Sequence, residues 1–182
     1  MNAENDIIMN ILYSPAVYTN KSNYPVDYIF NENSDFFLNY WLLTHYELHD
    51  LPDTWQPDDN LLSLILINWD KIPLVADLIG GYLLRDKLSL DREKFMTNPC
   101  LLAFISLPLL HNARLTCYET TIDTTSYGAA FILNIFSDIP AALIQRFFLC
   151  FPVGMELPQI HATKTPGNIN LLQMAVNYAH NY

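Results

Sequence analysis

Apolar residues recur at three- and four-residue spacing along much of the chain after residue 60, which is typical of helices with one buried face. The clearest stretch covers residues 73–88. Its buried stripe contains Leu74, Val75, Leu78, Ile79, Tyr82 and Leu83. Pro73 suits the first turn of a helix, because the N–H that proline lacks has no partner there. The pattern therefore predicts a helix over residues 73–88.

The same spacing, taken together with capping residues and prolines, predicts further helices. They are a helix that contains residues 36–43, helices over residues 61–71, 99–107, 127–136 and 140–150, and a terminal helix that contains residues 169–179. Ser34 or Asp35 can cap the first of them, and Asn98 caps the third, whose first turn holds Pro99. The helix over residues 61–71 is apolar nearly all round, so we expect it to lie centrally.

Three segments lack this periodicity and are predicted to be loops. Residues 1–35 are rich in Asn, Tyr, Ser and Pro, and residues 50–59 hold two prolines and four aspartates. Residues 111–125 are polar and rich in threonine, and they form either a loop or short strands. With only 5 glycines and no long alternating pattern, the chain is predicted to be all-α. We expect one compact domain over residues 1–182, with an acidic part at 1–59 and a helical core at 60–182.

Composition narrows the class of protein. Hydrophobic residues make up 51% of the chain and charged residues 15%, so either the core is large or an apolar surface is kept for partners. Cys100, Cys117 and Cys150 stand far apart among apolar residues, as reduced core cysteines do in the cytosol. We expect neither a signal peptide nor a membrane span, because no basic and apolar leader is present and the apolar stretches are short. The predicted location is cytoplasmic.

The negative charge is concentrated in the first part of the chain. Residues 1–70 hold eleven acidic side chains against Lys21 alone, and so carry the whole net charge of −10. This part is either a solvated acidic face or a docking surface for a basic partner. The candidate docking residues are Asp50, Asp53, Asp58 and Asp59, in the proline-broken loop. Nucleic acid is not expected as a partner, because phosphate binding needs a basic patch.

Candidate chemistry is sparse. His45 and His49 have the spacing of neighbours on a helix face, but a zinc hydrolase motif needs Glu directly after the first His, where this chain has Tyr46. The hypothesis that the protein is a helical metal-dependent hydrolase rests on this pair alone. Residues 123–126 (Asp-Thr-Thr-Ser) are interpreted as a polar loop with a helix cap, and Gly80-Gly81 as a point of close helix packing. We therefore predict a non-enzymatic protein without a cofactor or metal.

Two arginines stand in apolar helices. Arg85 lies near the end of the predicted helix over residues 73–88, where a cation is favoured by the helix dipole. Arg146 lies in a segment that is apolar on most sides. It is expected either in an internal ion pair or on a narrow exposed strip.

Four blocks of the sequence resemble the SctK family, of which OrgA and MxiK are members. They are residues 11–18, with Ser14 where the family has Asp; residues 69–85; residues 139–152; and residues 171–179. The family-motif positions in these blocks include Trp69, Pro73, Gly80, Arg85, Pro140, Arg146 and Pro152. None of the blocks is a catalytic motif, and the shared positions are those of a core, so no partner-contact residues are carried over.

The resemblance implies a cytoplasmic adaptor of the sorting platform of bacterial type III secretion injectisomes. Such a protein links the cytosolic domain of the inner-membrane ring protein (SctD class) to the pod protein (SctQ class), at the cytosolic face of the injectisome base. The alternative is a type III secretion chaperone, which is also small and acidic. A chaperone would favour a mixed α/β fold with alternating strands, which this sequence lacks.

Overall fold

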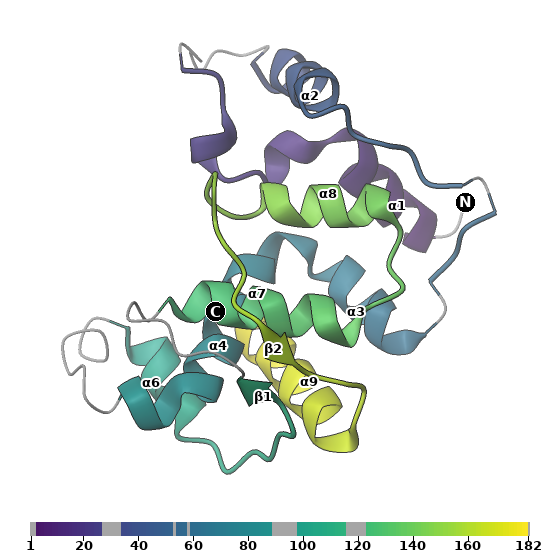
Figure 1. The fold of residues 1–182 in the computed structure, drawn as a ribbon. Helices are drawn as coiled ribbons and strands as arrows, with labels where there is room; N and C mark the ends of the chain where they lie inside the picture. Colours follow the sequence, from purple (N-terminus) through teal and green to yellow (C-terminus); the bar gives the residue numbers. More distant parts are fainter. Residues whose placement is uncertain are drawn as a thin grey trace. The chain divides into compact units, whose positions relative to one another are not determined.

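The computed structural model of the protein describes residues 3–26, 34–52, 54–57, 59–88, 98–115 and 123–181. These residues are mainly helical, so the prediction of an all-α fold is confirmed (Figure 1). The chain divides into two compact units. Unit 1 comprises Met1–Asp70 and Asp138–Met155, and unit 2 comprises Lys71–Ser137 and Glu156–Tyr182. The organisation of residues 1–182 as one domain stays a prediction.

Unit 1 is built from short helices around an apolar centre. Its elements are α1 (Ala3–Tyr13), the 3-10 helices η1 (Pro15–Val17) and η2 (Lys21–Asn23), α2 (Ser34–His45), α3 (Asn60–Ile67), η3 (Trp69–Lys71), whose last residue Lys71 belongs to unit 2, and α8 (Ala141–Leu149). Helix α1 contacts α3 and α8, which lie beside it in Figure 1, and η1 packs on α2. The central helix expected at residues 61–71 is two elements, because α3 closes at Asn68, whose side chain donates to the Leu64 carbonyl at 2.9 Å.

Helix α1 was not predicted. Its buried residues Ile8, Ile11 and Leu12 have helical spacing, but they stand among asparagines, which are weak helix formers. The helix is stabilised by burial of this short apolar face against α3 and α8, and such tertiary packing routinely overrides propensity.

Unit 2 is organised around one long helix. Its elements are α4 (Ile72–Leu88), α6 (Pro99–Ile105), β1 (Arg114–Leu115), α7 (Thr124–Ile135), β2 (Ile160–His161) and α9 (Pro166–His180). Helix α4 packs mainly on α7 and also contacts α6 and α9. The expected caps are present: the side chain of Asn98 accepts the N–H of Leu101 at 3.0 Å, and Asp123 starts α7. Helix α9 begins earlier than predicted, because Thr165 caps it and Pro166 occupies its first turn.

Residues 111–125 were predicted to be a loop, with short strands as the alternative, and the structure has a short strand at Arg114–Leu115. This strand pairs antiparallel with β2, so that Arg114 lies opposite His161 and Leu115 lies opposite Ile160. Residues 116–122 of that segment lie outside the described residues. No helix in the described part of the chain is both long enough and apolar enough to span a bilayer.

Helices α4 and α7 cross at very close range because both carry glycine at the contact. A methyl group at Gly80 would overlap the carbonyl oxygen of Thr124, and one at Gly128 would overlap that of Ala76. The same crossing holds a small polar network: Asp77 accepts a hydrogen bond from the Thr124 hydroxyl and a second, at 3.2 Å, from the Asn98 amide. Close packing at Gly80 agrees with the interpretation made from the sequence.

A candidate partner-docking surface on unit 1

The acidic surplus of the protein belongs to unit 1. Unit 1 contains twelve acidic and two basic side chains, whereas unit 2 contains seven of each, so the net charge of −10 falls on unit 1. The two basic residues of unit 1 are Lys21 and Arg146, and Arg146 is completely buried. The solvent-facing charge of unit 1 is therefore strongly negative.

The four candidate docking aspartates have different surroundings. Asp50 is exposed and accepts a hydrogen bond from the Tyr13 hydroxyl at 2.9 Å. Asp59 is half-buried and caps α3, since its carboxylate accepts the N–H of Leu62 at 2.6 Å. Asp53 and Asp58 lie outside the described residues. Asp59 thus has a structural role that the sequence did not suggest. Of the two described aspartates, Asp50 is the exposed one.

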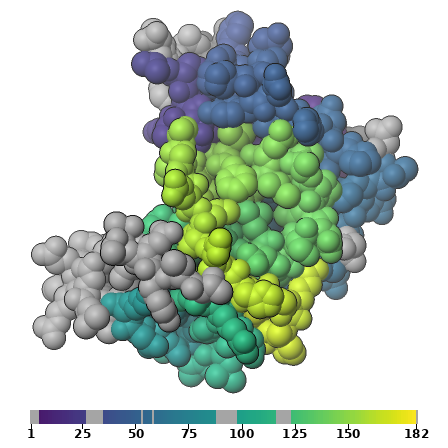
Figure 2. Space-filling model, in the orientation of Figure 1, coloured from purple at the N-terminus to yellow at the C-terminus, as the bar shows by residue number. Residues whose placement is uncertain are grey.

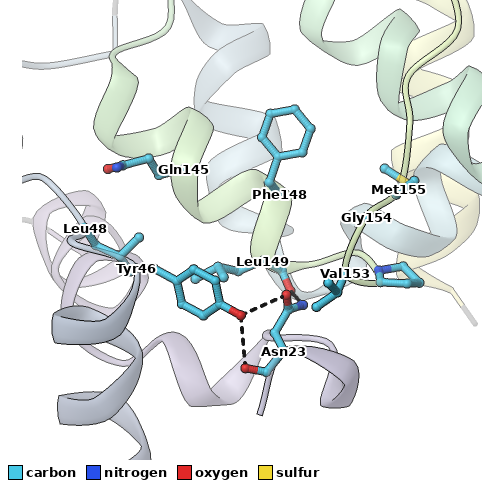
Figure 3. Close-up of a pocket in the computed structure, with 10 residues that line it drawn as sticks. Asn23, Tyr46, Leu48, Gln145, Phe148, Leu149, Val153, Gly154 and Met155 are labelled. Carbon is cyan, nitrogen blue, oxygen red and sulfur yellow. Dashed lines mark hydrogen bonds between the residues drawn. The ribbon is translucent and has the colours of Figure 1, made fainter. Parts of the chain in front are cut away.

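Unit 1 also has an open groove at the carboxyl end of α8, which we call the α8 groove (Figure 3). Its volume is about 350 Å³. The lining residues are Asn23, Tyr46, Leu48, Gln145, Phe148, Leu149, Pro152, Val153, Gly154 and Met155. Most of this lining is apolar, and the side chains of Phe148 and Val153 are 39% and 62% exposed.

Asn23 fixes the end of α8 at the floor of this groove. Its side-chain amide donates to the carbonyls of Leu149 at 3.3 Å and Phe151 at 2.8 Å, which lie at the end of the helix. The Tyr46 hydroxyl in turn donates to the backbone oxygen of Asn23 at 3.2 Å and to its side-chain oxygen at 3.4 Å (Figure 3). These bonds satisfy carbonyls that a helix end leaves without partners, so the groove has a defined shape.

The chain turns at Glu47, between the groove residues Tyr46 and Leu48. This residue has φ 47°, in the left-handed region that favours glycine, and the N–H of Leu48 donates back to the carbonyl of Leu43 at 3.0 Å. The following N–H, of His49, donates to the Gln145 side chain at 2.8 Å. The turn after α2 is thereby tied to α8.

Arg146 corrects both expectations made for it. Its side chain is completely buried, so it lies on no exposed strip, and within the described part of the chain its guanidinium bonds to carbonyls and not to a carboxylate. The acceptors are Leu12 (3.2 and 2.8 Å), His49 (2.7 Å) and Ala142 (2.9 Å). Burial lowers the pKa of Arg146 from its usual value, although nearby Tyr18 and Asp50 oppose that shift. The guanidinium joins α1, the turn after α2, and α8.

The predicted helical pairing of His45 and His49 is wrong. Helix α2 ends at His45, and the left-handed residue Glu47 then turns the chain, so the two histidines do not share a helix face. The His45 ring instead stacks on Trp41, with ring centroids 4.2 Å apart. Within the described ranges, no three His, Cys, Asp or Glu side chains lie close enough to hold a metal ion together.

Helix α2 presents aromatic side chains to the solvent. Phe36, Phe37 and Tyr40 are 75%, 63% and 65% exposed, and the rings of the two phenylalanines meet edge to face. Figure 2 shows α2, in blue, on the outside of unit 1. Adjacent exposed aromatics are more typical of a surface that meets a partner than of a solvated face.

The family-motif residues mostly have structural surroundings. Trp69 is buried, and its ring meets that of Tyr18 edge to face at 6.1 Å. Arg85 donates to the hydroxyl of Tyr82 at 2.6 Å and lies 4.6 Å from the centre of that ring. The prolines stand at boundaries: Pro73 in the first turn of α4, Pro140 before α8, and Pro152 after it, at the α8 groove.

Residues 8–181 match the sequence model of the bacterial type III secretion apparatus protein family OrgA_MxiK. The chain belongs to this family. The match runs from α1 into α9, so it covers both units and confirms the resemblance drawn from the four sequence blocks. No curated protein and no solved structure gives a significant match. Membership makes the chain a component of the type III secretion apparatus.

Proposed function

We propose that this chain is a non-enzymatic adaptor of the cytoplasmic sorting platform. It would link the cytosolic domain of the inner-membrane ring protein (SctD class) to the pod protein (SctQ class), and so support injectisome assembly and secretion. The observation that carries the proposal is the family match over residues 8–181. The segregation of charge supports it, because a strongly acidic unit suits a basic partner surface.

The fold favours this role over that of a secretion chaperone. A chaperone was expected to have a mixed α/β fold with alternating strands, whereas the strands in the described part of the chain form one pair of two residues each. The adaptor role requires surfaces and no catalytic centre. Unit 1 offers such surfaces in the acidic loop, the α8 groove and the aromatic face of α2.

The acidic loop can be tested by its effect on association with each partner. In the variant Asp50→Asn/Asp53→Asn/Asp58→Asn, Asp59 is retained, because its carboxylate caps α3. Charges near an interface mainly steer association, so we expect several-fold slower binding at low salt and a weaker dependence of the on-rate on salt. The measurement is the on-rate of the wild type and of the variant, across a salt series, with the purified pod protein and with the purified ring domain.

A matched control removes the same charge from unit 2, through Asp86→Asn/Glu93→Gln/Glu156→Gln. It should leave the on-rates nearly unchanged. Equal on-rates and flat salt dependence for the wild type and the loop variant would mean that the loop is a solvated face. If the wild-type chain binds neither partner, the adaptor role itself is wrong.

A further inference from the structure

A second groove of unit 1, between α1 and α3, is separate from the acidic loop and the α8 groove. We call it the α1–α3 groove, and its volume is about 360 Å³. The residues that line it are Ile7, Asn10, Ile11, Ser14, Val17, Tyr18, Leu66, Ile67, Trp69 and Asp70. They come from α1 and η1 on one side and from α3 and η3 on the other. Two sequence blocks that resemble the family, at residues 11–18 and 69–85, thus meet here.

The groove has a rigid apolar floor and an apolar rim. Ile11, Leu66 and Trp69 are buried, and the Trp69 ring is braced by the Tyr18 ring at 6.1 Å. The Tyr18 hydroxyl is itself held by the carbonyl of Ile11 at 2.6 Å. At the rim, Val17 and Ile67 are 77% and 56% exposed. A concave apolar site with two exposed aliphatic side chains at its mouth fits an apolar side chain of a partner.

Charge decides which kind of partner fits. Asp70 is exposed and lines the groove, and Asp6 is exposed on α1, one residue before the lining residue Ile7. The whole of unit 1 carries −10. A second copy of this unit would bring the same charge and would be repelled, and nucleic acid would be repelled for the same reason. A segment with Lys or Arg beside its apolar residues would be attracted.

We propose that the α1–α3 groove docks a basic amphipathic segment of another secretion-apparatus protein, with an apolar side chain in the groove and a Lys or Arg near Asp70. The inference rests on the proposed function, since it takes the occupant from one of the two platform partners. It adds the place on unit 1 where the segment binds and the chemistry of the segment. Apolar contact holds the complex together, and the acidic surroundings steer its formation.

The test pairs two exposed apolar positions of unit 1. Ile67 lines the groove and is 56% exposed, whereas Met9 lies on α1 outside the lining and is 53% exposed. Ile67→Lys and Met9→Lys add the same charge to the same unit. We expect Ile67→Lys to weaken binding to one of the two purified partners at least tenfold, and Met9→Lys to weaken it less than twofold. Ile67→Ala, which adds no charge, should weaken binding several-fold, and Met9→Ala should not.

A further variant tests the charge at the rim. Asp70→Asn should lower the on-rate at low salt, and its effect should disappear at high salt, because screening removes the contribution of an exposed carboxylate. Thermal unfolding of every variant provides the check on folding. All the substituted side chains are exposed, so the midpoints should stay close to that of the wild type.

The outcomes separate this inference from the proposed function. If the wild type binds a partner and Ile67→Lys and Met9→Lys weaken that binding equally, or neither weakens it, the groove assignment is overturned and the adaptor role stands. If the wild type forms a dimer that dissociates in Ile67→Lys while partner binding is unchanged, the groove binds a second copy of the chain. That result would also overturn the proposed occupant. Wild-type chain that binds neither partner would contradict the proposed function, and this inference with it.

Discussion

A single buried side chain, Arg146, holds three segments of unit 1 that lie far apart in sequence. Its guanidinium donates to the carbonyls of Leu12, His49 and Ala142 at 2.7–3.2 Å. Arginine suits this role because its donors form a fixed planar fork, whereas lysine has one ammonium group. The charge is compensated by carbonyl dipoles, with the carboxylate of Asp50 acting at longer range.

Replacing Arg146 should therefore destabilise the protein strongly. Arg146→Met would leave the buried carbonyl of Leu12 and the part-buried carbonyl of His49 without these donors, and a buried acceptor without a partner costs about 1–3 kcal/mol. We expect the free energy of unfolding to fall by about 3 kcal/mol or more, and Arg146→Lys to recover only part of the loss. Chemical denaturation monitored by circular dichroism measures both.

Arg85→Met is the matched control for this prediction. Arg85 is exposed, and its partner Tyr82 retains a hydrogen bond to the Leu107 carbonyl at 3.1 Å. The control should lower stability by less than about 1 kcal/mol. If Arg146→Met were no more harmful than Arg85→Met, the buried guanidinium would not be what joins α1 to α8.

At the scale of elements, the α4–α7 crossing depends on the small size of two residues. Gly80 and Gly128 each face a carbonyl oxygen of the opposite helix, and backbone atoms cannot move away as a flexible side chain can. The sequence suggested close packing at Gly80-Gly81 but gave no sign of Gly128 or of the helix that it meets.

The glycines of α4 make a paired prediction. Gly80→Ala should destabilise the protein by about 3 kcal/mol or more, because the added methyl group overlaps the Thr124 carbonyl and forces the helices apart. Gly81→Ala should be milder, since its methyl group meets the side chain of Leu101, which can shift. Thermal and denaturant unfolding of both variants would show the difference. Equal effects would mean that α4 and α7 do not cross at Gly80.

Helix α2 shows how an element can end where its sequence gives no stop signal. Glu47 adopts the left-handed conformation without being glycine, which is strained by about 1 kcal/mol or more. The N–H of Leu48, which bonds to the Leu43 carbonyl, and the bonds from Gln145 and Arg146 around residues 47–49 hold it there. The false pairing of His45 with His49 follows from this, because only the folded chain reveals where α2 ends.

At the scale of the whole molecule, the uneven charge should make stability depend on salt. Unit 1 carries a net charge of −10, and one of its two basic side chains, that of Arg146, is buried. The carboxylates on its surface therefore repel one another. Raising sodium chloride from about 10 mM to 150 mM shortens the screening length from about 30 Å to about 8 Å. We therefore expect the midpoint of thermal unfolding to rise by a few degrees.

The matched control for this prediction is the loop variant Asp50→Asn/Asp53→Asn/Asp58→Asn. It removes part of the repulsion and should melt at a higher temperature than the wild type at low salt, with less response to added salt. A midpoint that falls as salt rises would show that attractive charge pairs outweigh repulsion in this protein.

The amino-acid sequence by itself determined features that depend on neighbouring residues. Apolar spacing and prolines located α4, α6, α7 and α8, and Asn98 and Asp123 were identified as caps, because periodicity and capping act within a few residues. The family and the all-α class also came from the sequence, and both are confirmed. Helix α1 was missed because its short apolar face gains stability only through contact with α3 and α8.

The tertiary structure decided what depends on residues far apart in the chain. Arg146 meets the carbonyl of Leu12, 134 residues earlier, and residues 138–155 join residues 1–70 in unit 1. The α1–α3 groove likewise exists only because η1 and η3 are brought to the same place. Periodicity shows which face of a helix is buried, but it carries no information about the segment that covers that face. That pairing is set by the packing of the whole core.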